Sequence, residues 1–309
     1  MFGRVLAIAM NTYREAVRAR ILHGLIGLAL AASIYSLVVA TLSLHQETRV
    51  ISDVGTSSVS LFAVVVAVVI GATSLHREIE LKTVFPILTR RLRRHEYILG
   101  KYLGTLGTLG AFIALDGATI LALVAIHAKA LTGVLVAAGI LGVVLAVALV
   151  VAGTSRVFVI VPWAVVTLVV MAVLAGGAPD DRRLILASLA LTFGEVAIVS
   201  GVATLFASFS SPFLTAVFTL GIWLTGRSAE TLGNLPGRVF GETLRLLCLA
   251  ISRVVPNLQL YVPARPVLLG AVPEIPIWRF VGEATMHAFL YAGVLVLLSA
   301  LVFRKRDFQ

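Results

Sequence analysis

Long apolar segments recur along almost the whole chain, and the polar residues collect between them. A helix needs about 20 apolar residues to cross the hydrocarbon core of a bilayer. Segments of about this length predict eight membrane-spanning helices, at about residues 22–44, 58–76, 102–127, 131–153, 157–176, 184–207, 212–227 and 280–303. The pattern therefore predicts an all-α, polytopic transmembrane helix bundle that forms a single domain over residues 1–309.

The first 20 residues show a different pattern. Arg4, Asn11, Glu15 and Arg18 fall on one helical face, and small or aliphatic residues fall on the opposite face. We expect residues 1–20 to form an amphipathic helix at the membrane interface. The apolar stretch that follows is longer than the core of a usual signal peptide and has no clear small-residue cleavage site, so we interpret it as a retained first span.

The composition also favours a membrane protein. Hydrophobic residues make up 59% of the chain and charged residues 13%, with a mean hydropathy of +1.03, which exceeds what a soluble core can bury. The net charge of +10 would suggest nucleic acid for a soluble protein. Basic residues, however, also gather at the cytoplasmic ends of membrane helices, so we expect membrane lipids as partners and no nucleic acid. Cys248 is the only cysteine, which excludes an intramolecular disulfide.

The basic residues predict the orientation of the chain. The densest cluster consists of Arg90, Arg91, Arg93 and Arg94, and it lies in the short connection 77–101. The bias toward positive charge on the cytoplasmic side is strongest in short connections. Residues 77–101 are therefore expected in the cytoplasm, and an even number of spans then makes both termini cytoplasmic.

Two regions depart from simple spans. The long connection 228–279 is expected outside the cytoplasm, with an amphipathic helix that carries Arg238 and Arg245 on its polar face. The two segments 131–153 and 157–176 are joined by a minimal turn. A re-entrant pair is the alternative to two full spans there, and it would leave six spans with the same orientation of the termini.

The connection 77–101 reads REIELKTVFPILTRRLRRHEYILGK. Charged and apolar residues alternate in its first part, and its second part is strongly basic, so the pattern predicts two short helices. Glu78 and Lys82 are four residues apart, and with Ile79 and Thr83 they form a mixed surface that could dock into a groove on a partner. The alternative is a solvated loop that only sets the orientation of the chain.

These residues resemble a known family. The run REIELKT, the following PIL, the basic stretch and YILGKYLG resemble the cytoplasmic signature of permease subunits of type-2 ABC exporters, which joins the second and third spans. Three further segments resemble the same family in the same order, namely TYREAVRARILHG, GEVAIVSGVATLFASFSSPFLTAVFTLGIW and LVFRKRDFQ. The matches cover most of the chain, and residues 131–178 look like a two-span insertion into the six-span core of that family.

The resemblance implies an ABC transporter permease in the cytoplasmic (inner) membrane of a bacterium. It implies a homodimer or heterodimer of permeases bound to two separate nucleotide-binding ATPase subunits, which hold the ATP and Mg. The coupling helix that enters the ATPase would consist of Arg77, Glu78, Ile79, Glu80, Lys82 and Thr83. The chain contains no G-x-x-x-x-G-K-[ST] motif, so we expect a transport subunit that is not itself an enzyme and binds no cofactor of its own.

Four ionisable residues lie inside predicted spans: Asp116, Glu195, Glu283 and His287. A charge at the bilayer centre costs about 2.5 to 3.5 kcal/mol on insertion scales, so these side chains should face protein or water. Glu283 and His287 are four residues apart and could pair or share a proton. One interpretation is substrate or proton handling, and the other, favoured for Glu195, is hydrogen bonding between helices.

Catalytic and metal-binding patterns are absent from the sequence. The six histidines show no ligand spacing, and neither H-E-x-x-H nor G-x-S-x-G occurs, so we assign no metal and no active site. Three functions therefore compete. The leading hypothesis is the permease of an ATP-driven exporter with an unidentified substrate. The alternatives are a proton-coupled secondary transporter, although no inverted repeat is visible, and a non-transporting scaffold or signal relay whose outer connection binds a partner.

Overall fold

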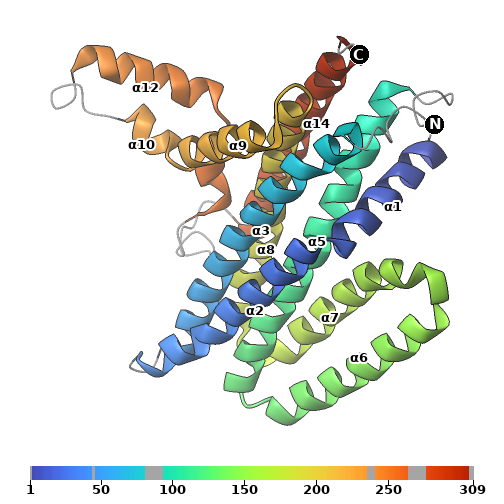
Figure 1. Ribbon diagram of the computed structural model, residues 1–309. Coiled ribbons are helices and arrows are strands. Elements are labelled where there is room, and N and C mark those ends of the chain that lie inside the picture. The colour runs from blue at the N-terminus through green and yellow to red at the C-terminus, as the bar shows by residue number, and fades with distance from the viewer. Residues whose placement is uncertain (1, 44–45, 81–92, 235–240, 264–275, 306–309) are drawn as a thin grey trace.

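The computed structural model describes residues 2–43, 46–80, 93–234, 241–263 and 276–305, and every regular element among them is a helix (Figure 1). The α-helices are α1 (Phe2–Arg18), α2 (Arg20–Thr41), α3 (Glu47–Glu80), α5 (Arg94–His127), α6 (Leu131–Val151), α7 (Ile160–Leu174), α8 (Pro179–Ala207), α9 (Pro212–Arg227), α10 (Ala229–Gly233), α12 (Glu242–Val254) and α14 (Ile277–Lys305). Three short 3-10 helices complete the set: η1 (Gly153–Val159), η2 (Ala175–Gly177) and η3 (Leu258–Tyr261). The predicted all-helical architecture is confirmed.

Seven of the described helical segments are long and apolar enough to cross a membrane. They are Arg20–Thr41, Glu47–Ser74, Arg94–His127, Leu131–Val151, Ser155–Gly177, Pro179–Ala207 and Ile277–Arg304. The segments predicted at 131–153 and 157–176 are both among them, which agrees with two full-length helices at that place. The eighth predicted span, 212–227, corresponds to α9, which has only 16 residues. A helix of that length is about 24 Å long, shorter than the hydrocarbon core of a bilayer.

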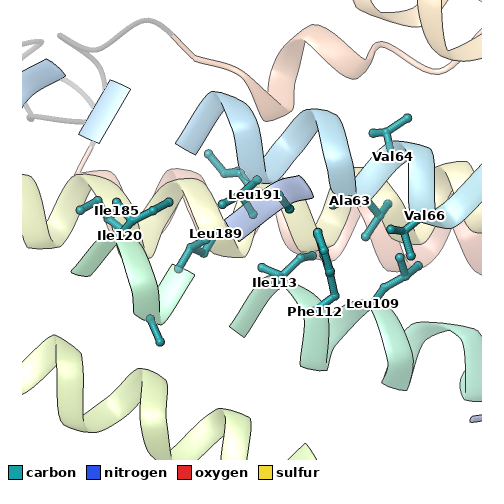
Figure 2. Packing of buried hydrophobic residues seen from close by; sticks show 14 of the residues in the cluster. Ala63, Val64, Val66, Leu109, Phe112, Ile113, Ile120, Ile185, Leu189 and Leu191 are labelled. Carbon is teal, nitrogen blue, oxygen red and sulfur yellow. The ribbon is translucent and has the colours of Figure 1, made fainter. Parts of the chain in front are cut away.

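The core of the bundle lies between α3, α5 and α8 (Figure 2). Aliphatic and aromatic side chains from all three helices interlock there, among them Ala63, Val66, Phe112, Ile113 and Leu189. Small residues allow the backbones to approach closely, as is usual where helices pack within a membrane. At Gly71 of α3, an added methyl group would collide with Ala203 of α8.

The amphipathic helix α1 packs along the first turns of α5. Its predicted apolar face includes Val5, Ala9 and Ala16, which are buried, and an added methyl group at Gly104 of α5 would lie 2.5 Å from the carbonyl oxygen of Ala9. The polar face contributes Arg4, whose guanidinium lies 3.8 Å from a carboxylate oxygen of the buried Glu96. The apolar face of α1 is therefore covered largely by protein.

The hairpin of α6 and α7 stands beside the bundle (Figure 1). Both helices are apolar on all sides, and only a few of their residues are buried, including Val134, Leu141 and Ala164. The indole nitrogen of Trp163 donates a hydrogen bond to the carbonyl oxygen of Leu141, 3.0 Å away, which ties the two helices together. A helix with an apolar surface on every side has lipid as its natural solvent.

The segment α9, α10 and α12 extends from one side of the bundle (Figure 1). The helix α12 lies in the connection 228–279 where an amphipathic helix was predicted, and Arg238 of the predicted polar face lies outside the described residues. Its apolar side chains Leu246, Leu247 and Val254 are exposed, and Arg245 forms an ion pair with Glu242 at 3.0 Å. The first turn of α1 and the last turn of α14 lie at the same end of the bundle, as do the last turn of α3 and the first turn of α5.

Candidate functional site

A buried carboxylate lies at the centre of the candidate site. Glu195 sits near the midpoint of α8 and is fully buried. Its Oε1 accepts hydrogen bonds from Arg227 Nε at 2.7 Å and from Trp223 Nε1 at 2.8 Å. Its Oε2 accepts from Arg227 Nη2 at 2.8 Å and from Ser60 Oγ at 3.1 Å. Four donor contacts therefore reach the two oxygens of this carboxylate.

Arg227 connects the other members of this group, which we call the Glu195 cluster (Ser60, Glu195, Trp223 and Arg227). Its Nη2 donates to Ser60 Oγ at 2.7 Å, and its guanidinium carbon lies 5.4 Å from the centre of the Trp223 ring. Trp223 and Arg227 are four residues apart at the end of α9, so they share one face of that helix. The cluster thus links α3, α8 and α9.

Burial of the Glu195 carboxylate requires its ion pair with Arg227 to remain intact. A carboxylate removed from water is stable only with a charged partner and with its remaining oxygens hydrogen bonded. The planar guanidinium of Arg227 supplies two parallel donors, which is the strongest arrangement available to such a pair. The Arg227 side chain keeps 25% of its surface exposed, whereas that of Glu195 keeps none. The cation is therefore the member of the pair that a ligand or water can reach.

A partly open cavity of about 240 Å³ adjoins the cluster. Its wall is rich in hydroxyl groups and includes one carboxylate and one guanidinium. The lining residues come from α3, α8, α9 and the region of η3, and they are Asp53, Thr56, Ser57, Ser60, Leu61, Leu184, Ser188, Thr192, Trp223, Arg227, Tyr261, Val262 and Pro263. Such a wall can hydrogen bond a polar group or orient water inside the bundle.

Tyr261 closes one side of this cavity. Its hydroxyl donates to the carbonyl oxygen of Ala284 at 3.2 Å and lies 3.0 Å from Nδ1 of His287. Burial and, to a smaller extent, the charge of Glu195 raise the pKa of Tyr261 above its ordinary value. The phenol therefore stays neutral and acts as a hydrogen-bonding group in the wall.

The other predicted intramembrane residues lie outside the Glu195 cluster. Asp116 is buried on α5 and accepts a hydrogen bond from Ser33 Oγ of α2 at 2.7 Å, while its Oδ2 has no hydrogen-bond partner among the described residues. Glu283 and His287 bind different groups. Glu283 pairs with Arg279 at 2.8 Å on an exposed face, and His287 faces Tyr261.

The predicted coupling residues occur at the end of α3. The backbone of Arg77, Glu78, Ile79 and Glu80 continues α3 without a break, and Lys82 and Thr83 lie outside the described residues. The far end of the connection 77–101 is likewise helical, because α5 begins at Arg94. The described parts of this connection are thus extensions of two long helices toward the end of the bundle that carries both termini.

Sequence reasoning missed three members of the cluster. Arg227 is the last residue of the predicted span 212–227, and neither it nor Ser60 nor Trp223 was singled out. The available signal was the i, i+4 spacing of Trp223 and Arg227 beside a carboxylate that needed a cation. In the described part of the chain, no group of three or more His, Cys, Asp or Glu side chains could hold a metal ion.

Comparison with known proteins does not assign this arrangement to a family. No protein-family model matches the chain, and a search of curated proteins finds no match. The functional interpretation therefore depends on the residues and their geometry.

Proposed function

We propose that this chain is the membrane-embedded permease subunit of an ATP-driven exporter of the ABC class. It acts as a dimer of permeases with two separate ATPase subunits, in the cytoplasmic membrane of a bacterium. The end of the bundle that carries the termini and the connection 77–101 faces the cytoplasm. The cavity beside the Glu195 cluster belongs to the pathway that the substrate follows.

The observation that carries this proposal is the continuity of α3. One uninterrupted helix bears four of the candidate docking residues, Arg77 to Glu80, at its end and part of the cavity wall further along. Ser60 and Glu78 are 18 positions apart, which corresponds to about 27 Å along a helix. A continuous helix moves as a rigid element, so a displacement at Glu78 reaches Ser60 and with it the Glu195 cluster. This geometry suits a permease that receives mechanical work at one end.

The state of Glu195 favours mechanical coupling over proton coupling. A carboxylate that carries protons must exchange them with water. Glu195 is instead fully buried, and each of its two oxygens accepts a hydrogen bond from a nitrogen of Arg227. It therefore serves as a structural anchor between helices, and ATP hydrolysis on a partner supplies the energy.

Charge reversal at the docking segment tests the proposal. The full chain is purified from its native membrane with its ATPase, reconstituted, and compared with the Glu78→Lys/Lys82→Glu double variant. Reversing charges at an interface places like charges opposite each other, so binding of the ATPase should weaken by at least about tenfold. Transport should fall with it. The matched control is Asp180→Lys, which changes an exposed charge at the start of α8. The start of α8 lies at the end of the bundle opposite to the last turn of α3, so this variant should bind the ATPase normally.

Two results would exclude the proposal. One is a purified chain that transports at full rate without any ATPase and follows an imposed pH gradient. The other is a double variant that binds the ATPase and couples hydrolysis to transport as well as the natural chain does. Hydrolysis that responds to a partner while no substrate crosses the membrane would favour a signal relay instead.

A further inference from the structure

A second cavity lies far from the Glu195 cluster, where the start of α5 meets the last turns of α14. Its volume is about 540 Å³. Arg93, Arg94 and His95 line it from the α5 side, and Leu297, Leu301 and Arg304 line it from α14. We call it the α5–α14 cleft. It lies at the end of the bundle that carries the chain termini.

The cleft divides into a basic part and an apolar part. Arg304 lies one turn beyond Leu301 on α14, so the cation is nearer to the end of the helix. The side chains of Leu297 and Leu301 are 67% and 58% exposed, although both lie in a helix long and apolar enough to span a membrane. The apolar part therefore faces hydrocarbon chains, and the basic part lies toward the headgroups.

The charge of the cleft selects for anions. Three guanidinium groups and one imidazole surround it, and no carboxylate occurs among the described residues that line it. Arg94 Nη1 donates to the carbonyl oxygens of Phe303 at 3.1 Å and Arg304 at 2.8 Å, which holds this guanidinium at the junction of the two helices. The first turn of α5 also presents the positive end of its helix dipole here.

Among the described residues, the acidic residue nearest in sequence to this group is Glu96, and it does not face the cleft. Glu96 is buried and turned toward α1, where its carboxylate lies 3.8 Å from Arg4 and accepts a hydrogen bond from the backbone nitrogen of Arg93 at 3.2 Å. The α5–α14 cleft thus offers concentrated positive charge above an exposed aliphatic wall. An amphiphile with an anionic head and an apolar tail matches both parts.

We infer that the α5–α14 cleft binds one anionic phospholipid from the adjacent leaflet. The phosphate lies among Arg93, Arg94, His95 and Arg304, and an acyl chain follows Leu301 and Leu297 along α14. The bound lipid joins the first turn of α5 to the last turn of α14, two segments more than 200 residues apart along the chain. The site is separate from the cavity at the Glu195 cluster, and it does not depend on the energy source of transport.

Native mass spectrometry of the full chain in mild detergent tests this inference. The probes are dioleoylphosphatidylglycerol and dioleoylphosphatidylcholine, which share their acyl chains and differ in net charge. Each basic residue near a membrane surface contributes about fivefold to the affinity for an anionic lipid, so the natural chain should prefer phosphatidylglycerol by more than about tenfold. The Arg93→Gln/Arg304→Gln double variant should lose about 30-fold in affinity for phosphatidylglycerol and keep its affinity for phosphatidylcholine.

Matched variants separate a defined site from general positive charge. Arg182→Gln/Arg183→Gln removes the same charge from another cleft, lined also by Trp278, and should leave the preference unchanged. Arg93→Lys/Arg304→Lys keeps the charge and should retain binding within about threefold. Because Arg94 holds the carbonyl groups at the end of α14, it is left intact in all variants.

Several outcomes would overturn the inference. Equal binding of the two lipids by the natural chain would do so without any variant, so the test does not depend on the folding of a mutant. Equal losses in the two glutamine double variants would indicate nonspecific attraction. Displacement of the lipid by inorganic phosphate alone would indicate a simple anion site, and a cross-link between two copies through Leu301 would indicate a protein interface.

Discussion

The ion pair between Glu195 and Arg227 allows a quantitative test, because its two members are buried to different extents. The Glu195 side chain has no exposed surface, and the Arg227 side chain keeps 25% of its surface exposed at the cavity. Removing the arginine leaves a buried carboxylate with only the neutral donors Ser60 and Trp223. Removing the glutamate charge leaves a guanidinium that can reach water. We therefore expect Arg227→Gln to destabilise the chain more than Glu195→Gln.

The magnitudes follow from this asymmetry. Breaking a buried pair by removing one partner costs about 3–5 kcal/mol, which applies to Arg227→Gln. The Glu195→Gln side chain still accepts a hydrogen bond, and the remaining cation is partly solvated, so a cost of about 1–3 kcal/mol is expected. The double variant contains no unpaired charge. Its cost should therefore be smaller than the sum of the single costs by about 2 kcal/mol.

Unfolding of the purified full chain in mixed micelles measures these energies. Increasing fractions of denaturing detergent unfold the protein, and tryptophan fluorescence reports the transition, with Trp223 as a local probe under the guanidinium. The control is Arg245→Gln, which breaks the exposed pair with Glu242 and should cost less than about 1 kcal/mol. Equal costs for the two single variants, or a double variant whose cost equals their sum, would refute the assignment of a coupled buried pair.

Two further predictions concern α1. Gly104→Ala should destabilise the chain by about 1–3 kcal/mol because the new methyl group collides with α1. The control is Gly107→Ala on the same helix, whose methyl group meets nothing within 4 Å and should change stability by less than about 1 kcal/mol. Detergent unfolding measures both variants, and similar values would contradict the packing of α1 on α5. Burial raises the pKa of Tyr13 to about 12, so the folded chain keeps a proton that the unfolded chain loses above its ordinary pKa of 10. Stability should therefore fall as pH rises from 10 to 12, and Tyr13→Phe should reduce that fall by up to about 2–3 kcal/mol in unfolding curves across this range.

The helices were predictable from sequence, but their ends were not. Hydropathy reports which segments prefer lipid, and it located the seven membrane-length helices found in the described part of the chain. It did not report that α3 begins at Glu47 or that α5 begins at Arg94, because those extensions are polar. Helical structure there depends on packing against neighbouring helices and on backbone hydrogen bonds, which an apolar window does not measure.

The amphipathic patterns identified helices but not what covers them. The face of α1 that contains Val5 and Ala9 was expected to contact the membrane interface, and much of it is buried on α5. The corresponding face of α12, with Leu246 and Leu247, is exposed. Periodicity alone gives the same signal in both cases, because it records only that an apolar surface exists.

The buried glutamate explains why the last turn of α9 lies beside the middle of α8. A fully buried carboxylate at the midpoint of α8 requires a cation at the same level of the bundle, and Arg227 at the last turn of α9 supplies it. The ion pair thereby fixes the end of α9 beside the middle of α8. The rule for basic residues treats each arginine independently of nearby carboxylates, so it gives no sign of this pairing.

Part of the predicted outer connection 228–279 also packs against α8 and forms one wall of the cavity beside the Glu195 cluster. The 3-10 helix η3 returns to α8, where Gly194 leaves room for the ring of Tyr261, and a side chain at that position would meet the ring at 3.0 Å. Tyr261 then reaches Ala284 and His287 on α14. Because α9 and η3 both contact the middle of α8, any movement that separates Arg227 from Glu195 also changes the cavity between them. In the proposed transporter, this junction is where displacement of α3 alters access to the pathway.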